Sequence, residues 1–201
     1  MKVAPPLTGI EVLDRSFFNV SIVRAPLHEV ALAFDGYTPM RVKTAITPFI
    51  LPTQPYGEAE IPMLLWAPKV APELTVFMPS VSSGDYFFTQ YCAQFKFDVI
   101  EFRTTTSKAK HQVNEFSAYS AGKKIRVVQS LQDSPRWVFF ERGEPLPFEL
   151  LEKYQSKFIR DRLTRDTILS YAKAWGAPLC QPDFWITEMP ALTFEKKREN
   201  S

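Results

Sequence analysis

The stretch Arg136–Arg142 (RWVFFER) carries the pattern that decides the fold. It is rich in aromatic and β-branched residues and follows a turn sequence that ends in proline, which predicts a β-strand. Successive strand side chains point to opposite faces. One face therefore carries Trp137, Phe139 and Glu141, and the other carries Arg136, Val138, Phe140 and Arg142. Neither face is wholly polar, so either both faces are covered by other segments or one face binds a partner.

Phe97–Arg103 (FDVIEFR) repeats this pattern and predicts a second strand of the same kind. Further strands are predicted at Phe17–Val23, Arg41–Leu51, Met63–Trp66, Leu74–Met78, Phe116–Ser120 and Lys124–Leu131. Strands outnumber helices and follow one another in pairs. We therefore expect an α+β fold with a mainly antiparallel sheet.

Helical spacing of apolar residues predicts helices at Leu27–Phe34 and Tyr86–Lys96, each between strands. The sheet is therefore expected to come from two β-α-β-type units. Two further helices, Phe148–Leu163 and Asp166–Trp175, form a helical C-terminal segment. The second of these is expected to be capped by Thr164 and ended by Gly176.

These elements predict a single α+β domain over residues 1–176, with residues 1–68 and 69–176 as its two halves. Residues 177–201 contain three prolines and end in a polar run. We expect this segment to be a Pro-rich wrap over the surface, with Phe184, Trp185 and Ile186 tucked in, followed by a polar tail.

Composition bounds the class of partner. Apolar residues make up 45% and charged residues 23%, which is typical of a globular chain. The net charge of +2 lacks the strong basic excess of nucleic-acid-binding domains, so nucleic acid is not expected as a partner. No apolar run is long enough to span a bilayer and no apolar leader is evident, which predicts a cytoplasmic protein without membrane contact.

Catalytic and cofactor motifs are sparse. The chain has 7 glycines and 2 histidines, and it contains neither a phosphate-binding loop nor a GxGxxG sequence. We therefore predict no cofactor, no metal site and no catalytic residue, and the balance leans against an enzyme. Cys92 and Cys180 are expected to be unpaired thiols, with Cys92 a small core residue.

Several carboxylates cluster after the last predicted strand, at Glu141, Glu144 and Glu149. We expect them to be solvated or ion-paired, because Arg103, Arg136 and Arg142 are available in the sequence to neutralise them.

The predicted binding residues are Arg103, Arg126, Trp137, Glu141 and Arg142. Trp137 with Arg126 and Arg142 matches the composition of protein–protein interface centres. Alternatively, Arg103, Arg126 and Glu141 orient a polar or anionic ligand inside a curved sheet, as in a small-molecule-binding protein or an enzyme.

The stretch from Trp137 to Glu149 (WVFFERGEPLPFE), the helix through Leu163 and the segment Tyr171–Gly176 together resemble bacterial immunity proteins of polymorphic-toxin and contact-dependent-inhibition systems. The resemblance is one of general character over residues 74–176 and assigns no role to an individual residue. It implies a cytoplasmic, non-enzymatic α+β protein that binds another protein and neutralises a toxin domain.

Overall fold

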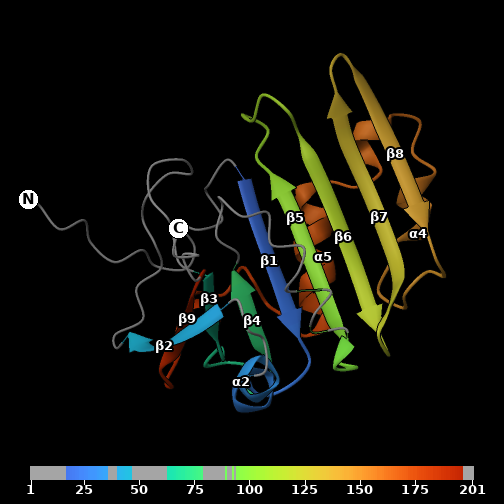
Figure 1. The fold of residues 1–201 in the computed structure, drawn as a ribbon. Helices are drawn as coiled ribbons and strands as arrows, with labels where there is room; N and C mark the ends of the chain where they lie inside the picture. The colour runs from blue at the N-terminus through green and yellow to red at the C-terminus, as the bar shows by residue number, and fades with distance from the viewer. Residues whose placement is uncertain are drawn as a thin grey trace, which may run out of the picture.

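A computed structural model of the chain describes residues 17–35, 40–46, 63–78, 89, 92 and 94–196. This part is α+β, and its nine strands form one antiparallel sheet in the order β2-β9-β3-β4-β1-β5-β6-β7-β8 (Figure 1). The strands are β1 (Phe17–Val23), β2 (Met40–Ile46), β3 (Met63–Trp66), β4 (Thr75–Met78), β5 (Val99–Thr105), β6 (Val113–Ser120), β7 (Lys123–Asp133), β8 (Arg136–Arg142) and β9 (Ala191–Lys196). The predicted fold class and antiparallel pairing are confirmed.

The strands that flank the predicted helices of the two β-α-β-type units do not pair with each other in the sheet. Helix α2 (Leu27–Asp35) joins β1 to β2, yet three strands separate these two. Strands β4 and β5 both pair with β1 and lie on either side of it. The two strands that flank the predicted helix in each proposed unit are therefore not neighbours, and an origin from two such units stays a prediction.

Strands β5 to β8 form a meander whose register sets the two faces. Val20, Phe102, Phe116 and Val128 lie opposite one another across four strands, and Glu141 of β8 ends this row. Cross-strand partners share a face. This face, which we call the helical face, lies against helix α5 (Arg165–Trp175), visible behind β5 and β6 in Figure 1.

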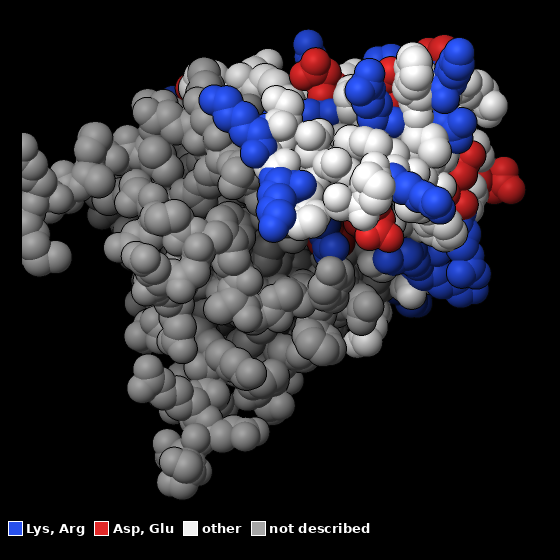
Figure 2. Space-filling model, turned by 90° about the horizontal axis from the view of Figure 1, so that it is seen from above, with Lys and Arg blue, Asp and Glu red and all other residues white. Residues whose placement is uncertain are grey.

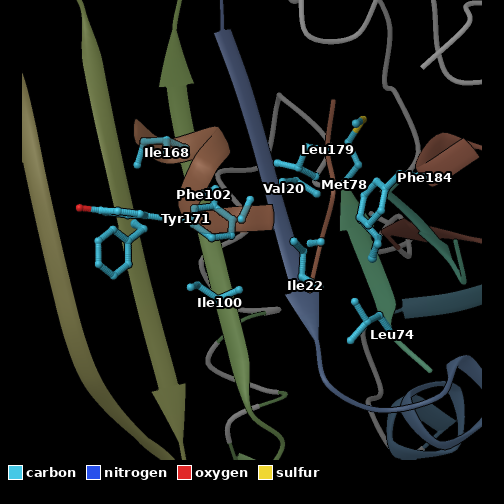
Figure 3. Close-up of a cluster of buried hydrophobic side chains, with 14 of the residues drawn as sticks. Val20, Ile22, Leu74, Met78, Ile100, Phe102, Ile168, Tyr171, Leu179 and Phe184 are labelled. Atoms are coloured by element: carbon cyan, nitrogen blue, oxygen red, sulfur yellow. The ribbon is translucent and has the colours of Figure 1, made fainter. Parts of the chain in front are cut away.

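The core fills the space between the helical face and α5. Figure 3 shows Ile168 and Tyr171 of α5 beside Phe102 and Ile100 of β5, within one buried cluster. The Tyr171 ring meets Phe116 edge-on, with ring centroids 5.6 Å apart.

The predicted caps of α5, Thr164 and Gly176, are confirmed. The Thr164 side chain accepts a hydrogen bond from the Thr167 backbone N–H, and the helix ends at Gly176 with a φ of 109°. A positive φ is open to glycine because it has no Cβ.

The predicted helix over Phe148–Leu163 is wrong. The chain there forms only α4 (Leu151–Tyr154) and the 3-10 turn η1 (Ile159–Asp161). The Ser156 carbonyl accepts from Arg162 Nε at 3.0 Å instead of continuing a helical ladder. The break allows Phe148 to pack on Phe116. Tertiary packing thus overrides the helical periodicity.

The Pro-rich segment follows the prediction only in part. Its 3-10 turn η2 (Pro182–Trp185) buries Phe184 and Trp185 in the core as predicted, whereas Ile186 is 48% exposed. Residues 191–196 then enter the sheet as β9, between β3 and β2. Pairing on both sides gives β9 the backbone hydrogen bonds that a surface wrap would take from water.

A second apolar cluster lies around α2, containing Val23, Leu27 and Val30. It includes Cys92, which is 1% exposed, as predicted for a core cysteine. Burial raises the pKa of the Cys92 thiol, and both cysteines are free. Most of the predicted helix Tyr86–Lys96 lies outside the described residues, as do residues 47–51 of the predicted strand Arg41–Leu51 and the tail 197–201.

Candidate functional site: the outer face of the terminal strand

The five predicted binding residues lie on both faces of the sheet. Arg126, Trp137 and Glu141 belong to the helical face, because Arg126 alternates with Val128 and Glu141 lies opposite it. Arg103 and Arg142 belong to the opposite face, which we call the outer face. A single ligand site cannot use all five residues through the sheet.

On the helical face, Arg126 is the centre of a buried ion-pair cluster. Its side chain is 2% exposed, and its Nη2 lies 2.7 Å from Glu149 Oε2 and 2.6 Å from Glu141 Oε2. Its Nε also donates to Glu149, and its Nη1 donates to the Gly143 carbonyl at 2.7 Å. Burial lowers the pKa of Arg126, but its hydrogen bonds to Glu149 and Glu141 outweigh burial and leave the pKa raised.

The Glu149 side chain is fully buried and accepts further hydrogen bonds besides those from the Arg126 guanidinium. The Leu146 N–H donates to Oε1 at 2.6 Å, and the Tyr154 hydroxyl donates to Oε2 at 2.9 Å. Burial is the main cause that raises the pKa of Tyr154, so the phenol stays a donor. The carboxylate predicted to pair with a neighbouring arginine is therefore paired with Arg126 instead. Its bonds hold the connection after β8 against the sheet.

The outer face of the sheet centre carries a second polar cluster. Arg103 Nη2 lies 2.7 Å from Glu101 Oε1, and its Nη1 lies 4.0 Å from Glu115 Oε2. Gln129 donates to Glu115 at 3.0 Å. Burial raises the pKa of Glu115, although the nearby Arg103 opposes the shift. The Asn19 side-chain oxygen is on the same face, buried and without a hydrogen-bond partner.

The outer face of β8 is different because its apolar side chains are exposed. Val138 is 44% exposed and Phe140 is 48% exposed. Arg136 and Arg142 stand on either side of them on the same face and are exposed too. Among the described residues, neither arginine forms an ion pair. We call these four residues the β8 outer face, and the exposed half of the RWVFFER pattern is what signals it.

The inward half of β8 has a structural role. Phe139 packs on Tyr154 at 5.4 Å, and the Arg162 guanidinium lies 5.4 Å from the Phe139 ring. Trp137, a predicted binding residue, is half-buried on this side. The strand thus places its anchoring side chains inward and leaves Val138 and Phe140 outward.

Phe158 is 55% exposed beside the η1 turn, and it is not among the binding residues predicted from the sequence. Lys157 and Arg160 lie 5.9 Å and 5.4 Å from its ring centroid. The segment was predicted to be helical, so no signal marked Phe158 as an exposed aromatic residue.

Figure 2 shows basic and acidic side chains interspersed over the described part of the face seen from above. A stripe of one sign, as needed to follow a phosphate backbone, is not seen on that part. No group of three or more His, Cys, Asp or Glu side chains placed to hold a metal occurs among the described residues.

None of the helices in the described ranges is long and apolar enough to cross a bilayer. Comparisons of the chain with protein-family models, with curated proteins and with solved structures gave no match.

Proposed function

We propose that this chain is a non-enzymatic cytoplasmic protein that acts by binding another protein through the β8 outer face. The observation that carries the proposal is the exposure of Val138 and Phe140 between Arg136 and Arg142, neither of which forms an ion pair with a described residue. Exposed aromatic residues beside arginine are the composition favoured at interface centres, and contiguous exposed apolar side chains mark interaction surfaces.

The bonding of the buried Arg126 cluster supports a binding role. Arg126 and Glu149 direct their hydrogen bonds to each other, to Glu141 and Tyr154, and to the neighbouring backbone. Groups engaged in this way stabilise the fold. The chemistry that is left exposed at β8 is that of a contact surface.

The resemblance to immunity proteins of toxin systems supports a toxin domain as the partner. On this proposal the chain occludes the toxin by covering it with the β8 outer face. Coexpression with the product of the adjacent reading frame would then relieve growth arrest caused by that product.

The test is affinity capture with the wild-type chain, with Phe140→Glu and with Leu32→Glu. Leu32 is 68% exposed on α2, so it is a matched exposed apolar control. The same partner should be retained by wild type and by Leu32→Glu. Phe140→Glu should weaken the purified partner's binding by about tenfold or more in calorimetry. Equal retention by both variants would show that the surface is wrong.

The outer-face cluster of Arg103, Glu101 and Glu115 favours one alternative, a small-molecule-binding protein or an enzyme, because the Asn19 oxygen beside it is buried without a partner. A thermal-shift screen of small polar ligands that carry both an anionic group for Arg103 and a hydrogen-bond donor for the Asn19 oxygen tests it. A ligand whose stabilisation disappears in Asn19→Leu would favour this alternative.

A further inference from the structure

We propose that β8 accepts an extended segment of a partner protein as an added strand, and that this segment carries two apolar side chains bracketed by two acidic ones. The inference rests on the proposed binding function and specifies its chemistry. Adding a strand to a sheet edge uses backbone hydrogen bonds for affinity and alternate side chains for specificity.

The edge of β8 is open to this pairing. β8 is the last strand in the sheet order, and its ladder runs to β7. Among the described residues, the backbone groups of 136–142 form no hydrogen bond outside that ladder. An edge strand with unpaired N–H and C=O groups is a template for another extended chain.

The side-chain spacing defines the incoming segment. Arg136, Val138, Phe140 and Arg142 occur at every second residue, so they follow one another along a single face. At about 3.3 Å per residue, the two arginines stand roughly 20 Å apart. A paired strand has the same repeat. Its matching side chains therefore follow the order acidic, apolar, apolar, acidic at alternate positions.

Charge selects the partner's ends. Arg136 and Arg142 are exposed and form no ion pair with a described residue, so each guanidinium can receive a carboxylate in the two-bond geometry that arginine favours. Val138 and Phe140 supply the apolar contact between these two pairs. Opposite charges across neighbouring strands stabilise pairing, and like charges oppose it.

The same rule disfavours a second copy of this chain as the occupant. Antiparallel pairing of all seven residues of β8 with its own copy is centred on Phe139. That register sets Arg136 of one copy directly opposite Arg142 of the other. The two arginines thus act against self-pairing and in favour of an acidic partner.

The experiment uses three synthetic peptides with the full-length chain: SETVTVTES, its basic counterpart SKTVTVTKS, and SETVPVTES, in which proline removes a central strand N–H. Fluorescence anisotropy measures binding to the wild type, to the double variant Arg136→Glu/Arg142→Glu and to the control Arg160→Glu. Arg160 is an exposed arginine outside the strand, with 64% of its side chain accessible.

We expect the wild type and Arg160→Glu to prefer the acidic peptide over the basic one by about tenfold or more. The double variant should reverse this order, and the proline peptide should bind about tenfold more weakly than its parent. Bound acidic peptide should also slow hydrogen exchange of the β8 amides.

Equal binding of the acidic and basic peptides, or exchange protection that leaves β8 unchanged, would overturn strand addition. If the partner captured above still depends on Phe140 in that case, the protein-binding function stands and only this inference fails. Dimerisation of the wild-type chain that is lost in a Val138→Glu variant would likewise contradict it, because a second copy would then occupy the edge.

Discussion

Replacing Glu149 with glutamine tests the buried ion-pair cluster at its centre. Glutamine keeps the shape, and its amide oxygen in the place of Oε1 can still accept from the Leu146 N–H. The amide NH2 in the place of Oε2 can no longer accept from the Tyr154 hydroxyl. The Arg126 guanidinium, 2% exposed, then retains only the half-exposed Glu141 as a charged partner. Removing one member of a buried pair costs about 3–5 kcal/mol. Because Glu141 remains, we expect about 3 kcal/mol, the low end of that range.

Urea unfolding followed by tryptophan fluorescence measures this loss. For a chain of this size, about 3 kcal/mol corresponds to a melting temperature lower by roughly 6–12 °C. The matched control is Glu144→Gln. Glu144 is an exposed carboxylate in the same connection, and its replacement should change stability by less than about 0.5 kcal/mol.

A double-mutant cycle with Arg126→Met separates pairing from general damage. The single Arg126→Met variant leaves Glu149 buried and unpaired, so it should cost about 3–5 kcal/mol. The double variant removes both charges and should lose less than the sum of the two single losses, by about 1 kcal/mol or more. Additive losses, or a Glu149→Gln loss below about 1 kcal/mol, would refute the view that this pair anchors the connection after β8.

Three further predictions concern other described residues. Phe139→Ala should cost about 2–4 kcal/mol in urea unfolding because the ring packs on the α4 side, whereas Phe140→Ala should cost less than about 1 kcal/mol; equal losses would contradict the assignment of faces. Gly143→Ala should cost about 3 kcal/mol or more, because its φ is 92° and a Cβ would lie 1.9 Å from a backbone carbonyl oxygen. Gly176→Ala, at a φ of 109° with open space around it, should cost only about 1–2 kcal/mol; the reverse order would show that packing at Gly143 is misjudged. Burial raises the pKa of Glu115, so the folded state binds that proton more tightly, and stability should fall as the pH rises from about 4.3 through the raised pKa. Glu115→Gln should flatten this fall in urea titrations across the same pH range, and an unchanged slope would assign it to other groups.

The strands rich in aromatic and β-branched residues were predictable from sequence. Phe17–Val23 and Arg136–Arg142 have the predicted bounds, and the two faces of β8 divide as the pattern indicates. The first three residues of β6, 113–115, were missed because their side chains are largely polar. Their strand pairing depends on partners such as Thr104, which donates to Asn114 at 2.6 Å.

Long-range partners were not predictable. Arg126 and Glu149 are 23 residues apart, and nothing in the local sequence shows that a side chain of β7 meets one from the connection after β8. The same limit explains the false helix over Phe148–Leu163, whose apolar spacing suits a helix but whose side chains are used in separate contacts. It also explains β9, since only the facing edges of β3 and β2 make that segment a strand.

For the candidate site, the sequence pattern and the exposed side chains point to the same strand, but the predicted residue set overlaps the β8 outer face only at Arg142. Arg142 lies on the exposed face, whereas Arg126 and Trp137 were grouped with it by composition and face the helices. Composition does not distinguish a free arginine from one that is enclosed by carboxylates. Only the three-dimensional structure shows which of the two an arginine is.

The place of β9 has a consequence for the order of assembly. Among the described strands, β2 pairs only with β9, in a register that sets Met40 opposite Lys196. As the chain leaves the ribosome, β2 cannot pair with β9 until all the residues between the two strands have been made. During that delay it is a newly synthesised strand without a neighbour, so this end of the sheet is where nascent-chain chaperones and proteases have their longest opportunity.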